Sequence, residues 1–130
     1  MKSGLADTSL FIAREAERAV AIDAVPALLV VSVVTVAELR AGVLAALDGP
    51  TRSQRLRTFE FVLGFDALPV DGAVADAWAT LRVALRDAGR RMGVNDAWIA
   101  ATAMAHGLPV VTQDDGFDAA VDLGLRVIRV

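Results

Sequence analysis

Short continuous apolar runs alternate along the chain with longer segments in which apolar residues recur every three or four positions. This alternation predicts the elements of the fold. Continuous apolar runs at 4–6, 27–31 and 108–111 are typical of strands that are buried on both faces of a sheet. Apolar residues three or four positions apart indicate amphipathic helices at 71–88 and 95–106. Because strands and helices alternate, the pattern predicts an α/β fold with a parallel sheet covered by helices on both faces.

The remaining segments fit the same alternation. A polar, helix-prone segment at 9–21 follows the first strand directly. Ser32 is a suitable N-cap for the helix after the second strand, and Gly49 with Pro50 is expected to end that helix. Further helices are expected at 51–63 and 117–123, a loop at 112–116, a short edge strand at 65–70 and a terminal strand at 125–130.

The helix expected at 95–106 carries signals at both of its ends. Asn95 is a good N-cap residue, and the alanine-rich run after it has high helix propensity. His106 and Gly107 suit the C-terminus, where a cation and a left-handed residue are both favourable. Asp96 in the first turn either complements the helix dipole or belongs to a site, and the helix alone does not decide between these interpretations.

Composition excludes several kinds of site. The 130-residue chain has the length of one domain, is 55% hydrophobic and has a net charge of −3, so its total charge does not indicate a nucleic-acid-binding protein. Without cysteine and with one histidine, it cannot form a disulfide, a thiolate zinc site or a histidine-rich metal site. No uncharged run reaches the roughly 20 residues that span a bilayer, so we expect a cytoplasmic protein without a membrane partner.

Four carboxylates are expected at one edge of the predicted sheet. Asp7 follows the first strand, Glu38 lies in the opening turns of the helix after the second strand, and Asp114 follows the strand at 108–111. Only a short connection links the end of the helix at 95–106 to the strand at 108–111, so this helix must run antiparallel to the strands. Its N-terminus, with Asp96, therefore lies at the same edge as the other acids. Sites in parallel sheets gather beyond the carboxyl ends of the strands, so this edge is the candidate site.

Each acid also has a structural interpretation. Asp7 would cap the first helix, Glu38 has capping-box spacing to Thr35, and Asp114 or Asp115 would be a turn residue. If the acids do gather, their repulsion requires either bound protons or a cation. Oxygen ligands alone favour Mg²⁺ or Mn²⁺, and such an ion suits an in-line displacement at phosphorus.

Four segments resemble those of a known family. They are LADTSLFI at 5–12, SVVTVAELRAG at 32–42, NDAWIAATA at 95–103 and VTQDDGF at 111–117. In this order and spacing they resemble PIN-domain proteins, and the chain is similar to the VapC-type toxins of bacterial toxin–antitoxin pairs. The resemblance covers essentially the whole chain, so we expect a single PIN domain over residues 1–130.

The resemblance implies a three-layer α/β/α sandwich around a five-stranded parallel sheet, with Mg²⁺- or Mn²⁺-dependent endoribonuclease activity. Carried over residue by residue, the family's catalytic acids are Asp7, Glu38, Asp96 and Asp114. Asp7 and Asp96 are then the principal metal ligands, Glu38 orients or helps to ligate, and Asp114 holds a water or a second ion. The implied partners are a cognate antitoxin protein, an RNA substrate and a second copy in a homodimer.

One position departs from the family pattern. Many relatives have an acid immediately before the last Phe of the fourth segment, where this chain has Gly116. Asp115 is shifted by one position, so either Asp114 alone or Asp114 with Asp115 fills the fourth acidic role. Thr8 and Thr112 flank the acids with hydroxyl groups that would support carboxylates or waters.

Two further questions stay open at the level of sequence. Arg82, Arg86, Arg90 and Arg91 either hold an RNA backbone near the entrance of the site or, for the first two, form a solvated helix face. The rival to the nuclease hypothesis is a catalytically silent PIN-like module that works by docking a partner protein.

Overall fold

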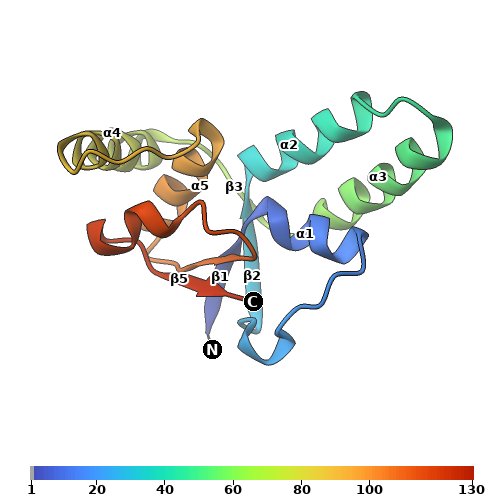
Figure 1. Cartoon of the computed structure of the whole chain (residues 1–130), viewed down its shortest axis with the longest axis horizontal. Coiled ribbons are helices and arrows are strands. Elements are labelled where there is room, and N and C mark those ends of the chain that lie inside the picture. Colours follow the sequence, from blue (N-terminus) through green and yellow to red (C-terminus); the bar gives the residue numbers. More distant parts are fainter. Residues whose placement is uncertain (1) are drawn as a thin grey trace.

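The computed structural model describes residues 2–130, and its centre is one five-stranded sheet (Figure 1). The strand order is β3-β2-β1-β4-β5, and every neighbouring pair is parallel. The strands are β1 (Ser3–Ala6), β2 (Leu28–Ser32), β3 (Ala67–Leu68), β4 (Val110–Thr112) and β5 (Val127–Arg129). The short β3 lies at an edge, as Pro69 in that segment predicts.

Helices cover both faces of the sheet, which confirms the predicted three-layer α/β/α sandwich. On one side lie α1 (Thr8–Glu15), α2 (Val33–Leu44) and α3 (Gly49–Val62); on the other lie α4 (Gly72–Asp87), α5 (Val94–Ala105) and the 3₁₀ helix η2 (Asp118–Leu123) (Figure 1). A further 3₁₀ turn, η1 (Ile22–Ala24), precedes β2. None of the helices within 2–130 combines the length and apolarity needed to cross a membrane.

Alternate side chains of the central strand β1 belong to separate halves of the core. Leu5 packs in a cluster with Leu81 of α4, Ile99 of α5 and other buried residues, whereas Ala6 packs in a second cluster with Phe11 of α1. Both side chains are fully buried. The continuous apolar run at 4–6 therefore reflects a strand covered on both faces.

The first helix is shorter than the sequence predicts. We expected a helix over 9–21, but α1 ends at Glu15, and Glu17 has a left-handed φ of 55°. The Arg18 N–H donates to the Ala13 carbonyl oxygen at 2.8 Å, which closes the turn. The helix-prone composition gave no warning of this stop because the left-handed position is occupied by glutamate rather than glycine.

The predicted stop at Gly49 and Pro50 is also wrong, because these residues begin α3 instead of ending α2. The preceding helix already ends at Leu44. Asp48 caps α3, and its Oδ1 accepts a hydrogen bond from the Thr51 N–H at 2.8 Å. Proline is favourable in a first helical turn, where its missing N–H removes no helical hydrogen bond.

Helix α5 differs from the prediction at its N-terminus. Gly93 rather than Asn95 is the N-cap of α5, and the Gly93 carbonyl accepts the Ala97 N–H at 2.9 Å. The other end agrees with the sequence: His106 is the C-cap residue, and Gly107 has a φ of 64°. Because Asn95 does not cap the helix, its side chain is available to contact Glu38.

The C-terminal elements lie within a few residues of their expected places. We expected strands at 108–111 and 125–130 and a helix at 117–123. The strands observed are Val110–Thr112 and Val127–Arg129, and the helical segment is the 3₁₀ helix η2. β4 thus begins only after Pro109, which has no N–H to donate to a neighbouring strand.

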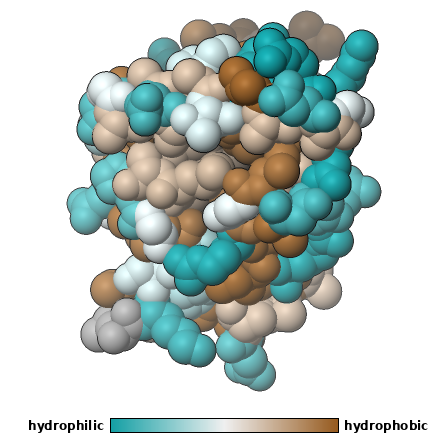
Figure 2. All heavy atoms as spheres, turned by 90° about the vertical axis from the view of Figure 1, so that its left-hand side faces the viewer, coloured by the Kyte–Doolittle hydropathy of each residue, from teal (hydrophilic) through white to brown (hydrophobic). Residues whose placement is uncertain are grey.

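The face of the molecule over α4 and α5 is chemically mixed. Figure 2 shows hydrophilic side chains interrupted by apolar ones on this side. Val83 is 46% exposed and Val94 is 67% exposed. Trp78 and Trp98, from the two helices, stack with ring centroids 4.7 Å apart. Polar and apolar side chains are therefore mixed on this face.

Gly4→Ala is expected to lower the free energy of unfolding by about 1–3 kcal/mol, the usual cost of overpacking a core. A Cβ on Gly4 would lie 2.7 Å from Val111 Cγ2 and 3.1 Å from Pro26 Cγ, inside the sheet. Urea unfolding measures the effect. Gly72→Ala is the matched control, because nothing lies within 4 Å of its added methyl group. Equal unfolding midpoints for the two variants would contradict tight packing at Gly4.

Candidate active site

All four acids singled out in the sequence line one pocket beyond the carboxyl ends of the strands. The pocket has a volume of about 310 Å³. Its walls are Asp7, Thr8, Ser9, Ile12, Arg18, Glu38, Asp96 and Asp114. The structure therefore brings together side chains that come from the ends of β1 and β4, from the second turn of α2 and from the first turn of α5.

Asp7 is the most buried of the four acids, with 3% of its surface exposed. The hydroxyls of Ser9 and Thr112 both donate to its Oδ2, each at 2.6 Å. Burial raises the pKa of Asp7, and hydrogen bonds from the two hydroxyls and from the Ser9 backbone offset this only in part. Oδ2 is thus held by two hydroxyl donors at the wall of the pocket.

Glu38 is held by residues from two other helices. The Thr8 hydroxyl donates to its Oε1 at 2.7 Å, and the Asn95 amide donates to its Oε2 at 3.4 Å. The capping box between Thr35 and Glu38 is not formed, because Ser32 caps α2 and Thr35 lies buried within the helix. The Thr35 hydroxyl is instead 3.0 Å from the Thr8 hydroxyl. Glu38 is therefore directed toward the pocket.

Asp96 shows the strongest electrostatic effect of the group. Burial, followed by the negative charges of Asp7, Glu38 and Asp114, raises the pKa of Asp96 to about 6. Its carboxylate is thus destabilised in the charged form by the three other acids. This is the repulsion that the sequence pattern predicted, and a cation or a proton would relieve it.

Asp114 and Asp115 have different surroundings. Asp114 lines the pocket, and its N–H donates to the Thr112 hydroxyl at 3.0 Å. Asp115 does not line the pocket, and its carbonyl oxygen accepts the Asp118 N–H at 3.1 Å before η2. The position of Asp114 suits the fourth acidic role, whereas a role for Asp115 stays a prediction.

The donor atoms fit a hard divalent cation. They are carboxylate oxygens supported by hydroxyls, which is the chemistry that Mg²⁺ and Mn²⁺ prefer. Within the part of the chain that the structure describes, no three acidic or histidine side chains are close enough to form a preassembled metal cluster. Mg²⁺ does not require such a cluster, because it is usually bound by one or two carboxylates together with waters and substrate phosphates.

Sequence reasoning missed two residues of the pocket wall, Ile12 and Arg18. Arg18 is a positive charge on an otherwise acidic wall, yet it forms no ion pair with any acid in the range 2–130. It reaches this place because α1 stops at Glu15 and the chain turns at Glu17. No sequence signal for that turn was available, so the pattern placed Arg18 on a continuing helix.

Gly116 faces the Asp96 carboxylate. A Cβ at Gly116 would lie 2.8 Å from Asp96 Oδ2, and one at Gly93 would lie 3.6 Å from the same atom. The position where many relatives carry an acid is therefore occupied here by a residue that leaves room for Asp96. A larger side chain would displace the end of a flexible carboxylate rather than the backbone.

Gly116→Ala is accordingly expected to reduce activity more than stability. The methyl group would shift the Asp96 carboxylate. If Asp96 is a catalytic acid, as the family resemblance implies, misplacing it by about 1 Å would cost roughly 10²-fold in rate. Unfolding in urea should change by less than about 1 kcal/mol, because the displaced group is a side-chain end. Gly72→Ala serves as the control, since its methyl group meets open space. Full cleavage activity of Gly116→Ala would show that this contact does not position Asp96.

The sheet order and the acidic pocket define a parallel α/β/α protein with a carboxylate site at the ends of its strands. The chain belongs to the PIN-domain family, whose model matches residues 5–123. The sequence-based prediction of this family is thereby confirmed.

Relatives place the chain more closely within the family. It is 48% identical to Ribonuclease VapC5 of Mycobacterium tuberculosis, with 98% of this chain and 96% of the relative covered. It is 44% identical to Ribonuclease VapC4 of the same organism, with 98% of both chains covered. The resemblance to VapC-type proteins found in the sequence is confirmed by these matches.

Solved structures agree with this placement. A crystal structure of VapBC-5, a member of the VapBC family of toxin–antitoxin systems from M. tuberculosis, matches with a TM-score of 0.93 and 45% identity over 100% of both chains. The structure of FitAcB from Neisseria gonorrhoeae matches with a TM-score of 0.73 and 31% identity, covering 96% of both chains.

Proposed function

We propose that this protein is a Mg²⁺- or Mn²⁺-dependent endoribonuclease and the toxin of a toxin–antitoxin pair. The observation that carries the proposal is the convergence of Asp7, Glu38, Asp96 and Asp114 on one pocket. The names of the relatives, which are ribonucleases, support RNA as the substrate. Residues 1–130 would act as a single PIN domain, and the proposed location is the cytoplasm.

The pocket residues take distinct roles in this proposal. Asp7, together with Asp96, would hold the divalent ion. When bound, such an ion polarises a phosphate and makes water a stronger nucleophile. Ser9 and Thr112 fix the orientation of Asp7 through hydrogen bonds to Oδ2. Glu38 and Asp114 would complete the negative wall and orient water.

The proposed partners are an antitoxin, an RNA and a second copy of the chain. The antitoxin proposal is supported by the similarity to VapBC-5, a member of the VapBC family of toxin–antitoxin systems. Apolar side chains stand exposed on α1 and at the end of α3, where Ile12 is 38%, Phe61 40% and Leu63 56% exposed. This surface on α1 and α3 is the candidate antitoxin face, and a homodimer is proposed because the family resemblance implies one.

The test is cleavage of a structured RNA by the purified chain with Mg²⁺ and with EDTA. We expect cleavage with Mg²⁺ and none with EDTA, since the pocket offers carboxylates but no paired base and nucleophile. A mock purification from cells that lack the protein controls for contaminating ribonuclease. Cleavage that persists in EDTA would overturn the metal dependence, and no cleavage under either condition would overturn the nuclease proposal and favour a silent docking module.

A further inference from the structure

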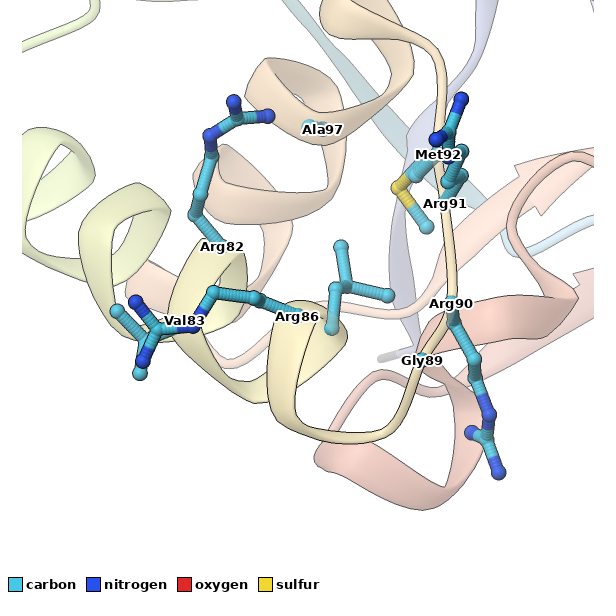
Figure 3. Close-up of a pocket in the computed structure, with 9 residues that line it drawn as sticks. Arg82, Val83, Arg86, Gly89, Arg90, Arg91, Met92 and Ala97 are labelled. Atoms are coloured by element: carbon cyan, nitrogen blue, oxygen red, sulfur yellow. The ribbon is translucent and has the colours of Figure 1, made fainter.

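A second concave surface lies beside the acidic pocket, between the C-terminal half of α4 and the segment 89–93 that leads to α5 (Figure 3). Its volume is about 790 Å³. Four of its lining residues are Arg82, Arg86, Arg90 and Arg91, and no acidic residue of the described chain lines it. We call this surface the arginine groove. It is a concentrated positive surface on a protein whose net charge is negative.

Two of the four arginines are already paired. Arg90 binds Asp122 through the two terminal nitrogens of its guanidinium group, one of them at 2.8 Å, and also donates to the Ala119 carbonyl oxygen at 3.1 Å. Arg86 lies 3.2 Å from Asp87, although both side chains are exposed. Figure 3 shows Arg90 directed toward η2 and away from the other arginines. Arg90 therefore fastens the segment 89–93 to η2.

Arg82 and Arg91 differ from Arg86 and Arg90 in their ion pairing. Neither forms an ion pair with any acid between residues 2 and 130. The Arg82 guanidinium lies 5.5 Å from the centre of the Trp78 ring, which orients it. In Figure 3 both side chains point toward the end of the groove at which Ala97 lies. These two residues carry the uncompensated positive charge of the arginine groove.

The arginine groove and the acidic pocket meet at the first turn of α5. Ala97 lines the groove, whereas its neighbour Asp96 lines the pocket. The segment 89–93, which forms one wall of the groove, ends at Gly93 beside the Asp96 carboxylate. A polymer held in the groove would therefore be directed to the acids.

We propose that the arginine groove binds the backbone phosphates of a single RNA strand on one side of the bond that is cut, with Arg82 and Arg91 as the phosphate-binding residues. The proposal rests on the nuclease function proposed above. A planar guanidinium group matches phosphate oxygens through paired hydrogen bonds. Phosphate contacts fix the position of a strand without reading its sequence, so the arginine groove supplies affinity and direction.

The experiment measures binding of a fluorescently labelled single-stranded oligoribonucleotide to the full chain in EDTA, over a series of KCl concentrations. The groove variant combines Arg82→Ala with Arg91→Ala. Its affinity at low salt should fall at least about tenfold. The slope of log affinity against log salt should fall by about 1.4, because each phosphate contact on a single strand contributes about 0.7.

The matched control combines Arg40→Ala with Arg57→Ala. It removes the same charge from exposed arginines on α2 and α3, outside the arginine groove. We expect its salt slope to equal that of the unmodified protein. A second groove variant, with glutamine at positions 82 and 91, repeats the measurement with the length of the side chains largely kept.

The outcomes separate this inference from the nuclease proposal. An unchanged slope in the groove variants, equal losses in groove and control variants, or no RNA binding by the unmodified protein would each overturn the groove inference. Failure of the unmodified protein to cleave RNA with Mg²⁺, while it binds RNA through Arg82 and Arg91, would overturn the nuclease proposal alone.

Discussion

Asp96→Asn is expected to abolish RNA cleavage and, in metal-free buffer, to make the fold more stable. Removing one charge from the cation site should lower the cleavage rate by at least about 10³-fold, since an ion at such a site contributes several kcal/mol to catalysis. The stability gain follows from burial and from the charges of Asp7, Glu38 and Asp114, which all oppose the ionised form of Asp96. Because Asp96 is only half-buried, solvent screening limits the gain at neutral pH to about 1 kcal/mol.

The same residue gives the stability of the metal-free protein a defined dependence on pH. The pKa of Asp96 is raised to about 6 in the folded protein, so the folded state binds a proton that the unfolded chain has already lost. The contribution of Asp96 to stability is therefore greatest below the ordinary pKa of aspartate and is lost as pH rises through about 6. Burial also raises the pKa of Asp7, which adds to the fall in the same direction.

Urea unfolding in EDTA at about pH 4.5 and pH 7.5 measures this effect. The unmodified protein should lose stability between the two conditions, and Asp96→Asn should lose less of it. Asp76→Asn, on an exposed position of α4, is the control and should follow the unmodified protein. A lower stability of Asp96→Asn at pH 7.5 would show that the acids do not repel one another in the folded state.

The elements that sequence predicted well are those whose pattern reflects burial. The runs at 4–6 and 27–31 are strands because both faces of the central sheet are covered by helices. The acids were located by the same logic, because a parallel topology places the ends of β1 and β4 at one edge. Asp7, Glu38, Asp96 and Asp114 share a pocket for that reason, while their catalytic roles remain proposals.

The features that sequence reasoning missed depend on contacts between distant segments. Asn95 has the chemistry of an N-cap, but the helix begins earlier and its amide reaches Glu38. Glu17 adopts a left-handed conformation that glutamate rarely prefers, and this turn brings Arg18 to the pocket. Local propensity carries no information about either outcome, because each is decided by tertiary structure.

Asp7→Asn and Asp7→Ala are expected to be equally inactive but to differ in stability. Either change removes the most buried charge of the pocket, so cleavage with Mg²⁺ should fall at least about 10³-fold. Asparagine keeps a carbonyl oxygen that accepts the Ser9 and Thr112 hydroxyls, which now donate to Oδ2 at 2.6 Å. Because its side chain is neutral, burial no longer opposes it, and metal-free stability at neutral pH should be maintained or raised.

Alanine removes the acceptor altogether. The Ser9 and Thr112 hydroxyls then lose their common partner in a buried position, which should cost about 1–3 kcal/mol of folding free energy. Cleavage assays with Mg²⁺ and urea unfolding in EDTA measure the two effects separately. If both variants unfold at the same urea concentration, the hydroxyls do not depend on Asp7 for their orientation. If Asp7→Asn keeps cleavage within tenfold of the unmodified protein, the charge of Asp7 is not part of the reaction, because the amide preserves its shape and hydrogen bonds and removes little else.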